Sequence, residues 1–241
     1  MSKTKAIIFD LDGVLTNSEW FIAEASRLMF KEVHEVDVVH DDFIPFVGLG
    51  ENRYLGGVAE KYNIKDFNIE HDKEKTYEIY IDLVKKPGAL KPLPGAIEFV
   101  HRSRELGLKT ALATSTDQIK MMANLEAIGL ISIEMRSDQI GLAAAIEAAA
   151  RNKAFDAMVN GQDVERQKPY PDLFLEAVYR LEEEPASCWV VEDSIGGIEA
   201  AKAAGMRSLA LLTTFPEEEI KAANPDKIAK DLSAIKPEEL L

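Results

Sequence analysis

Cysteine, long apolar runs and basic residues are scarce in this chain, and each shortage excludes something. The single cysteine, Cys188, excludes an internal disulfide and indicates a reducing compartment. No apolar run approaches the roughly 20 residues that a membrane-spanning helix needs. The 28 Lys and Arg stand against 42 Asp and Glu, and the net charge of −14 disfavours nucleic acid or an anionic membrane as a partner. Any phosphate site must therefore carry its own local cations.

The length and patterning indicate an α/β fold. At roughly 150 residues per domain, 241 residues favour one domain with an insertion or two small ones. Short apolar strands alternate with amphipathic helices after residue 95, which is typical of a parallel sheet covered on both faces. We expect strands at 6–9, 109–113, 157–159, 188–191 and 207–212, and helices at 95–106, 118–128, 171–182 and 195–204.

A long segment after the first strand follows a different pattern. Residues 17–88 have helical periodicity without a convincing strand, and proline and glycine interrupt the chain at 87–88 and 92–95. We expect residues 17–89 to form a helical cap inserted into a core of residues 1–16 and 90–241, with hinge strands at 14–18 and 86–94. Residues 131–153 include a nearly polyalanine helix, expected to be a surface excursion or else a dimer contact or rim of the site.

The first strand, Ala6 to Phe9, ends in the sequence Asp10-Leu-Asp12-Gly13. Side chains alternate along a strand, so Asp10 and Asp12 can point the same way where the strand ends. Gly13 lets the backbone turn without a Cβ penalty. Two carboxylates this close repel each other unless a cation or a shared proton relieves them. The motif taken alone also fits an Asp-Gly turn with solvated carboxylates.

Three further groups of polar residues follow strands or lie in loops, where ligands bind in a parallel α/β sheet. Thr114 and Ser115 offer hydroxyls at a helix N-terminus, suited to a phosphate or to an ordinary N-cap. Lys168 lies in a loop stiffened by prolines, although a lone loop lysine is usually solvated. Glu192 and Asp193 follow an apolar strand and could cap a helix or complete a cation site. Their order along the chain makes coincidence a poor explanation.

Together these residues suit phosphoryl transfer. Asp10, the backbone carbonyl of Asp12 and Asp193 could hold a divalent metal, with Glu192 binding directly or through water. The metal and Lys168 would cancel the repulsion between a phosphate and Asp10. With an ordinary pKa near ~3.9, Asp10 should be ionised and nucleophilic at neutral pH. Asp12 can protonate the leaving oxygen and then activate water.

The chain resembles the haloacid dehalogenase (HAD) superfamily over essentially its whole length. Its four motifs appear in order as Asp10-Leu-Asp-Gly-Val, Thr114, Lys168-Pro and Glu192-Asp193. The resemblance implies a Rossmann-like HAD core with a helical cap, and it makes Asp10 the nucleophile and Asp12 the acid/base. It also implies that Thr114 binds phosphate, that Lys168 neutralises charge, and that Mg²⁺ binds at Asp10, Asp12 and Asp193.

Within the superfamily the chain is similar to the β-phosphoglucomutase and phosphoglycolate phosphatase group. The stretch 45–58 also looks like the HAD domains of plant and algal chloroplast proteins. Asp12 argues against a dehalogenase. Ile22, Val47 and Asp117 stand where the mutase has a histidine and two lysines, which favours a phosphatase. In the cap, Gly48 and Arg53 are candidates for contact with substrate, with a surface role as the alternative for Arg53.

The sequence therefore predicts a Mg²⁺-dependent phosphatase that hydrolyses a small phosphorylated metabolite through an aspartyl-phosphate. The alternatives are β-phosphoglucomutase-type transfer and a non-catalytic HAD-fold binding module. We expect a monomer or weak homodimer that binds neither nucleic acid nor membrane. No basic leader or signal peptide precedes the first strand, which predicts the cytoplasm, or the chloroplast stroma if a transit peptide has been removed.

Overall fold

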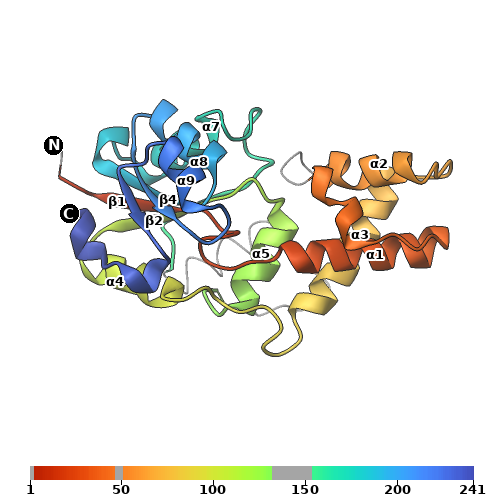
Figure 1. Cartoon of the computed structure of the whole chain (residues 1–241). Helices are drawn as coiled ribbons and strands as arrows, with labels where there is room; N and C mark the ends of the chain where they lie inside the picture. Colours follow the sequence, from red (N-terminus) through yellow and green to blue (C-terminus); the bar gives the residue numbers. More distant parts are fainter. Residues whose placement is uncertain (1–2, 47–50, 132–153) are drawn as a thin grey trace. The chain divides into compact units, whose positions relative to one another are not determined.

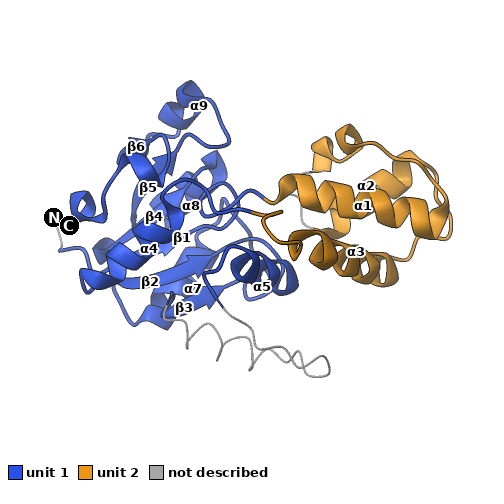
Figure 2. Cartoon of the chain, turned by 90° about the horizontal axis from the view of Figure 1, so that it is seen from below, with its two compact units in different colours: residues 1–17, 91–241 blue, residues 18–90 orange. Residues whose placement is uncertain are grey.

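Six parallel strands form the centre of the larger of two compact units in this computed structural model, which describes residues 3–46, 51–131 and 154–241. The first unit comprises residues 1–17 and 91–241, and the second comprises residues 18–90 (Figure 2). None of the described helices is both long and apolar enough to cross a membrane. The second unit corresponds to the helical segment expected at 17–89, and its role as a cap stays a prediction.

The sheet of the first unit has the order β3-β2-β1-β4-β5-β6. Its strands are β1 (Ala6–Phe9), β2 (Lys109–Ala113), β3 (Ala157–Val159), β4 (Cys188–Glu192), β5 (Arg207–Leu211) and β6 (Lys227–Ala229). Every neighbouring pair is parallel. Because helices connect parallel strands, both faces are covered, and the predicted α/β class is confirmed.

Helices pack on the two faces of the sheet (Figure 1). They are α4 (Ala96–Glu105), α5 (Gln118–Ala127), α7 (Asp172–Leu181), α8 (Ile195–Ala203) and α9 (Glu217–Ala222), with 3₁₀ turns η3 (Pro185–Ser187), η4 (Leu232–Ala234) and η5 (Pro237–Leu240). Alternation along β1 divides the core: Ala6 and Ile8 pack with α7 and α8, whereas Phe9 meets Phe99 of α4 edge to face at 6.1 Å.

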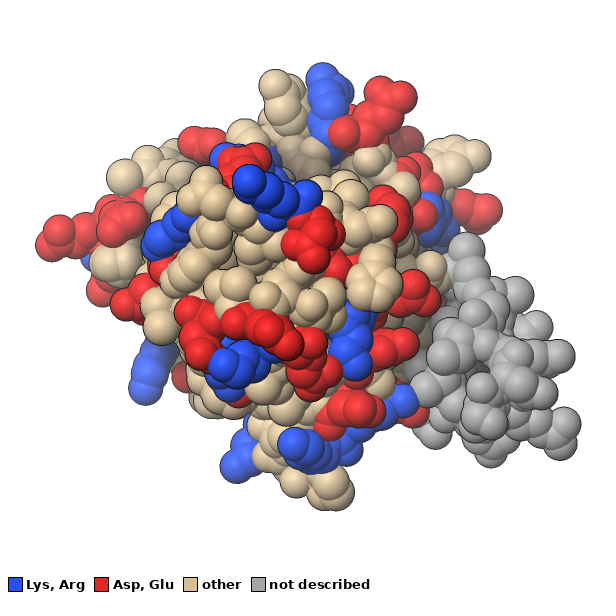
Figure 3. Space-filling model, turned by 90° about the vertical axis from the view of Figure 1, so that its right-hand side faces the viewer, with Lys and Arg blue, Asp and Glu red and all other residues tan. Residues whose placement is uncertain are grey.

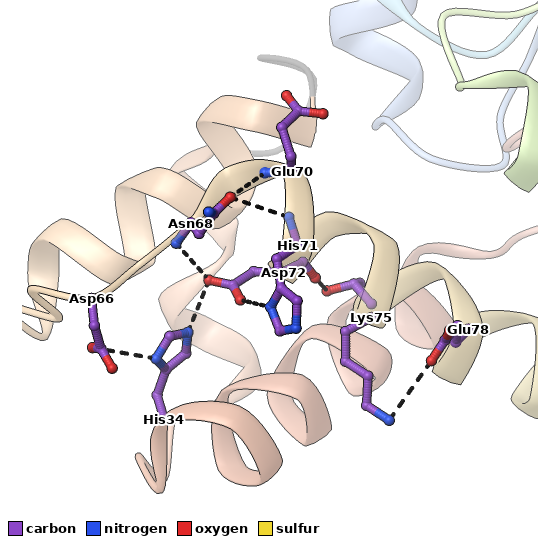
Figure 4. A network of polar contacts seen from close by, with 9 residues as sticks. His34, Asp66, Asn68, Glu70, His71, Asp72, Lys75 and Glu78 are labelled. Carbon is purple, nitrogen blue, oxygen red and sulfur yellow. Dashed lines mark hydrogen bonds and ion pairs between the residues drawn. The ribbon is translucent and has the colours of Figure 1, made fainter.

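The second unit is helical. It contains α1 (Glu19–His34), η1 (His40–Asp42), η2 (Ile44–Phe46), α2 (Glu51–Lys61) and α3 (Ile69–Val84). Helix α1 packs along α3 and buries Ile22, Met29 and Phe30. At the start of α3, the buried carboxylate of Asp72 accepts a hydrogen bond from His34 of α1 (Figure 4). This polar contact joins the end of α1 to the first turn of α3.

The segments that connect the two units pair with each other inside the first unit. The hydroxyl of Thr16 donates to the carbonyl of Lys91 at 2.8 Å, and the amide of Leu93 donates to the carbonyl of Leu15 at 2.8 Å. Thr16 and Pro92 form an isolated antiparallel bridge. This short ladder lies within the segments expected at 14–18 and 86–94, and their role as hinges stays a prediction.

Surface charges are mixed rather than segregated on the face drawn in Figure 3. Acidic and basic side chains are interspersed there. Many surface charges are paired, as Lys31 with Asp37 at 2.7 Å and Lys75 with Glu32 at 3.2 Å in the second unit. Exposed pairs of this kind contribute little to stability. The excess of negative charge is therefore not gathered into a single patch on this face, and three further carboxylates, of Asp10, Glu192 and Asp193, lie buried in the first unit.

Candidate active site

The polar residues singled out in the sequence gather at the carboxyl ends of the central strands. Phe9, the last residue of β1, is in register with Leu112 of β2 and Val191 of β4. The residues that follow these strands therefore emerge at the same edge of the sheet. They include Asp10 after β1, Thr114 after β2, and Glu192 and Asp193 at the end of β4.

Lys168 lies between two carboxylates at this edge. Its Nζ atom is 2.8 Å from Oδ1 of Asp10 and 2.5 Å from Oε1 of Glu192. The same ammonium lies 5.2 Å from the centre of the Phe174 ring, a cation–π contact with α7. Burial alone would lower the pKa of Lys168, but the charges of Asp10 and Glu192 raise it. Lys168 is thus a cation paired with two carboxylates, with its side chain only 11% exposed, and not a solvated loop lysine.

Glu192 is fixed by the beginning of α8. Its Oε2 atom accepts hydrogen bonds from the amides of Asp193 and Ser194 at 2.9 and 2.8 Å and from the Ser194 hydroxyl at 2.8 Å. Burial would raise the pKa of Glu192, but Lys168 and Ser194 hold it below its ordinary value. A Cβ at Gly197 would lie 1.9 Å from this carboxylate, so glycine is required where α8 passes it. The backbone of α8 therefore sets the position of Glu192.

Three buried carboxylates, of Asp10, Glu192 and Asp193, offer oxygens within 4.8 Å of one another. Burial raises the pKa of Asp10 to about 7, against the pull of Lys168. Burial and the charges of Glu192 and Asp10 raise the pKa of Asp193 to about 8. The expectation that Asp10 is ionised by its ordinary pKa alone is therefore wrong, and one ammonium is too little positive charge for this cluster. A divalent cation with oxygen ligands fits it.

Asp12 is held from the neighbouring strand. Its Oδ2 atom accepts a hydrogen bond from the Thr116 hydroxyl at 3.0 Å, and the amide of Thr116 donates to Oγ1 of buried Thr114 at 3.2 Å. The loop after β2 thus orients the carboxylate beside Asp10. The carbonyl oxygen of Ser115 lies against Gly161, where it would be 2.2 Å from an added Cβ.

Some residues near the site escaped the sequence reasoning. Thr116 follows the predicted pair Thr114 and Ser115 but was given no role, and nothing in the sequence marked Gly161, whose amide donates to the Thr116 carbonyl at 3.1 Å. Thr213 and Thr214 after β5 also reach the site, through Gly13 and Asp193. Adjacent hydroxyls directly after an apolar strand were the available signal for these two, the same signal that identified Thr114.

Two further candidate residues, Gly48 and Arg53, belong to the helical segment. Gly48 lies outside the described residues, as do Val47 and residues 132–153. Arg53 is on α2 and pairs with Glu60 at 2.8 Å, with its guanidinium 5.2 Å from the centre of the Phe46 ring. Those contacts fit the surface role considered for Arg53, and its contact with substrate stays a prediction.

Comparisons with known proteins agree with this geometry. The chain is 40% identical over 239 residues to the chloroplast protein SUPPRESSOR OF QUENCHING 1 of Arabidopsis thaliana, covering 99% of this chain and 21% of that protein. It is 31% identical to a phosphorylated carbohydrates phosphatase of Thermotoga maritima, covering 98% of this chain and 96% of that one. The crystal structure of CbbY from Rhodobacter sphaeroides in complex with phosphate shares the fold, with a TM-score of 0.76, 21% identity and 95% coverage of both chains.

The chain spans about a fifth of the length of the Arabidopsis protein but nearly all of the Thermotoga protein. The model of haloacid dehalogenase-like hydrolases matches residues 4–205, which include every residue of the carboxylate and lysine cluster. The resemblance stated from the four motifs is confirmed, and the chain belongs to the haloacid dehalogenase-like hydrolases.

Proposed function

We propose that this hydrolase is a Mg²⁺-dependent phosphatase that forms an aspartyl-phosphate on Asp10. The observation that carries the proposal is the Lys168 ammonium, 2.8 Å from Asp10 and buried beside it. A phosphate and a carboxylate repel each other, so attack requires positive charge at the point of contact. Lys168 supplies part of that charge, and a cation bound to the carboxylates would supply the rest.

The cation would be bound by Asp10, Asp193 and the backbone carbonyl of Asp12, with Glu192 contributing its charge directly or through water. When bound, Mg²⁺ would neutralise charge on the transferring phosphoryl group and keep Asp10 ionised at neutral pH. The raised pKa of Asp10 and of Asp193 supports this assignment, because each carboxylate lacks a full complement of positive charge.

In the first step an Oδ atom of Asp10 attacks phosphorus while Asp12 gives its proton to the leaving oxygen. The bond between phosphorus and that oxygen breaks, and the alcohol leaves. In the second step Asp12 takes a proton from water, whose oxygen attacks phosphorus, and the bond to Asp10 breaks to release phosphate. The bond from Thr116 to Asp12 supports this dual role, since it holds the carboxylate in one place through both steps.

The substrate is proposed to be a small phosphorylated metabolite, and the named activity of the Thermotoga relative supports a phosphorylated carbohydrate. Ile22, where the mutase has a cap histidine, is buried within α1, and Asp117 precedes α5 as its N-cap. Neither residue offers a cation to a second phosphate, which favours hydrolysis over mutase transfer. The chloroplast name of the Arabidopsis relative supports the stroma over the cytoplasm.

Residues 18–90 are proposed to act as the cap that keeps bulk water from the reacting phosphate. The paired connections at Thr16 and Lys91 support this, since Thr16 also forms a backbone bridge with Asp12. Small-angle scattering should show a smaller radius of gyration with Mg²⁺ and a phosphate mimic than with Mg²⁺ alone. An unchanged radius would contradict the cap.

The central test is phosphate release from p-nitrophenyl phosphate and a panel of sugar phosphates with Mg²⁺. Asp10→Asn keeps the shape of the side chain and removes the nucleophile, so turnover should fall at least about 1,000-fold. A loss below tenfold would contradict the covalent route. With β-glucose 1-phosphate and catalytic glucose 1,6-bisphosphate, faster formation of glucose 6-phosphate than of free phosphate would show a mutase instead.

A further inference from the structure

Two adjacent threonines after β5, Thr213 and Thr214, contact the segments that follow β1 and β4. The Thr213 hydroxyl donates a hydrogen bond to the carbonyl of Gly13, in the turn that follows Asp12. The Thr214 hydroxyl donates to the carboxylate of Asp193. Gly13 lies between them: a Cβ built there would be 1.9 Å from Oδ2 of Asp193 and 2.8 Å from Oγ1 of Thr214.

The short loop that carries these threonines is anchored on both sides. Before them, the amide of Leu212 donates to the carbonyl of Ala229 at 3.0 Å, which extends the pairing of β5 with β6. After them, Phe215 packs with Leu212 against a buried cluster of Ile198, Ala210 and Ile220. The hydroxyls are therefore held by sheet and core before any ligand binds, as a preorganised site requires.

Asp193 is the carboxylate that most needs such support. It is 5% exposed and faces the negative charges of Glu192 and Asp10, which favour turning its carboxylate away. A hydroxyl that donates to one carboxylate oxygen of Asp193 fixes the direction in which the other oxygen points. Hydrogen bonds of this kind around metal ligands typically change metal affinity by about 10- to 100-fold.

We propose that Thr214 is a positioning residue that orients Asp193 toward the cation, and that Thr213 ties the same loop to the Asp12 turn. This inference rests on the proposed function, because it concerns the cation of that site. Thr214 itself is exposed, so its replacement should leave the fold intact. Sequence reasoning assigned no role to either threonine.

The test measures the binding of Mg²⁺ to the purified chain without substrate. The readout is the rise in unfolding temperature across a Mg²⁺ titration. Thr214→Val removes the hydroxyl and keeps the shape, and Thr214→Ser keeps the hydroxyl. Thr4→Val is the matched control, because the Thr4 hydroxyl bonds to the carbonyl of Leu240 at the amino ends of the strands, away from the cation.

We expect Thr214→Val to weaken Mg²⁺ binding about tenfold, and Thr214→Ser to bind within twofold of the wild type. Thr4→Val should unfold at a lower temperature with unchanged Mg²⁺ affinity. With p-nitrophenyl phosphate, the activity of Thr214→Val should recover at saturating Mg²⁺, a rescue that a general structural defect would not show.

The failures of the two proposals are distinguishable. If Mg²⁺ stabilises the wild type and Thr214→Val at the same concentrations, the role of Thr214 is wrong while the cation site stands. If Mg²⁺ stabilises neither protein, the cation site of the proposed function is wrong, and the role of Thr214 falls with it.

Discussion

Lys168 and Glu192 form a buried ion pair with 2.5 Å between Nζ and Oε1. The other oxygen of Glu192 accepts three hydrogen bonds from Asp193 and Ser194, so the turn between β4 and α8 holds the ion pair in place. The lysine therefore takes its position from a strand rather than from its own loop. This arrangement places a cation 2.8 Å from Asp10 with little freedom to withdraw.

Replacing Lys168 by methionine should destabilise the first unit by about 3 kcal/mol, since the buried carboxylates of Asp10 and Glu192 would then lose their opposite charge. Urea denaturation without Mg²⁺ measures the change. The double variant Lys168→Met with Glu192→Gln should be more stable than the single one, because it removes an uncompensated charge. A single variant as stable as the wild type would show that the ion pair contributes nothing to folding.

Gly13→Ala should reduce turnover at least about 100-fold, because the added methyl group displaces Asp193. Gly13 has a φ of +78°, and the new Cβ would lie 1.9 Å from Oδ2 of Asp193. Gly107→Ala is the matched control: Gly107 has the same φ of +78° and nothing within 4 Å of a Cβ. Gly107→Ala should lower the stability of the fold by only about 1–2 kcal/mol, through backbone strain, and should leave turnover normal. Equal effects of the two variants would assign the whole loss to strain.

Asp72 should make the stability of the helical unit depend on pH. Burial would raise the pKa of Asp72, but hydrogen bonds from His71, His34 and the amide of Asn68 hold it below its ordinary value of 3.8. A lowered pKa stabilises the fold above the unfolded value and loses that contribution as the pH falls through the folded value. Stability should therefore decline below about pH 4.

Asp72→Asn should remove that decline and destabilise the protein by about 1.5–3 kcal/mol at pH 7. Asp66→Asn is the control, because Asp66 also faces His34, at 3.6 Å, but its side chain is 84% exposed (Figure 4). Thermal unfolding from pH 3 to 8 compares them. The same pH profile for wild type and Asp72→Asn would exclude Asp72 as the titrating group.

Replacing Mg²⁺ by Ca²⁺ should separate the effect of the metal's charge from the effect of its coordination geometry. Mg²⁺ enforces six-coordinate binding, whereas Ca²⁺ accepts more ligands and can take both oxygens of Asp10. We therefore expect Ca²⁺ to stabilise the folded chain and to inhibit phosphate release in competition with Mg²⁺. Activity in Ca²⁺ alone that matches the Mg²⁺ rate, or full activity in excess chelator, would contradict the proposed role of the metal.

Much of the fold followed from local patterns. The strand predicted at 109–113 and the helix predicted at 195–204 differ from β2 and α8 by at most one residue, because each couples an apolar run to a clear glycine or polar boundary. Strand β6 was missed: all three of its residues are half-buried, and it exists because it extends the edge of β5. Pairing at an edge leaves little trace in hydrophobic periodicity.

The candidate site also combines residues that the sequence identifies with contacts that only the folded structure shows. Asp10 and Glu192 could be found because each follows an apolar strand, and Lys168 because prolines surround it. What sequence could not give was the pairing of Lys168 with both acids or the pKa of about 7 for Asp10, since burial and distance depend on the packed sheet. Thr214 follows an apolar strand as Thr114 does, but its interaction with Asp193 depends on the packed sheet for the same reason.

The contact between Thr4 and Leu240 has a consequence for how this domain can be joined to other polypeptide. The carbonyl of Leu240 accepts hydrogen bonds from the Thr4 hydroxyl and from Nε1 of Trp189, so both chain ends leave the sheet side by side (Figure 2). They leave at the amino ends of the strands, opposite the edge that carries Asp10. Fusion partners at either end, or insertion of the whole domain into a host loop, should therefore leave the catalytic edge unobstructed.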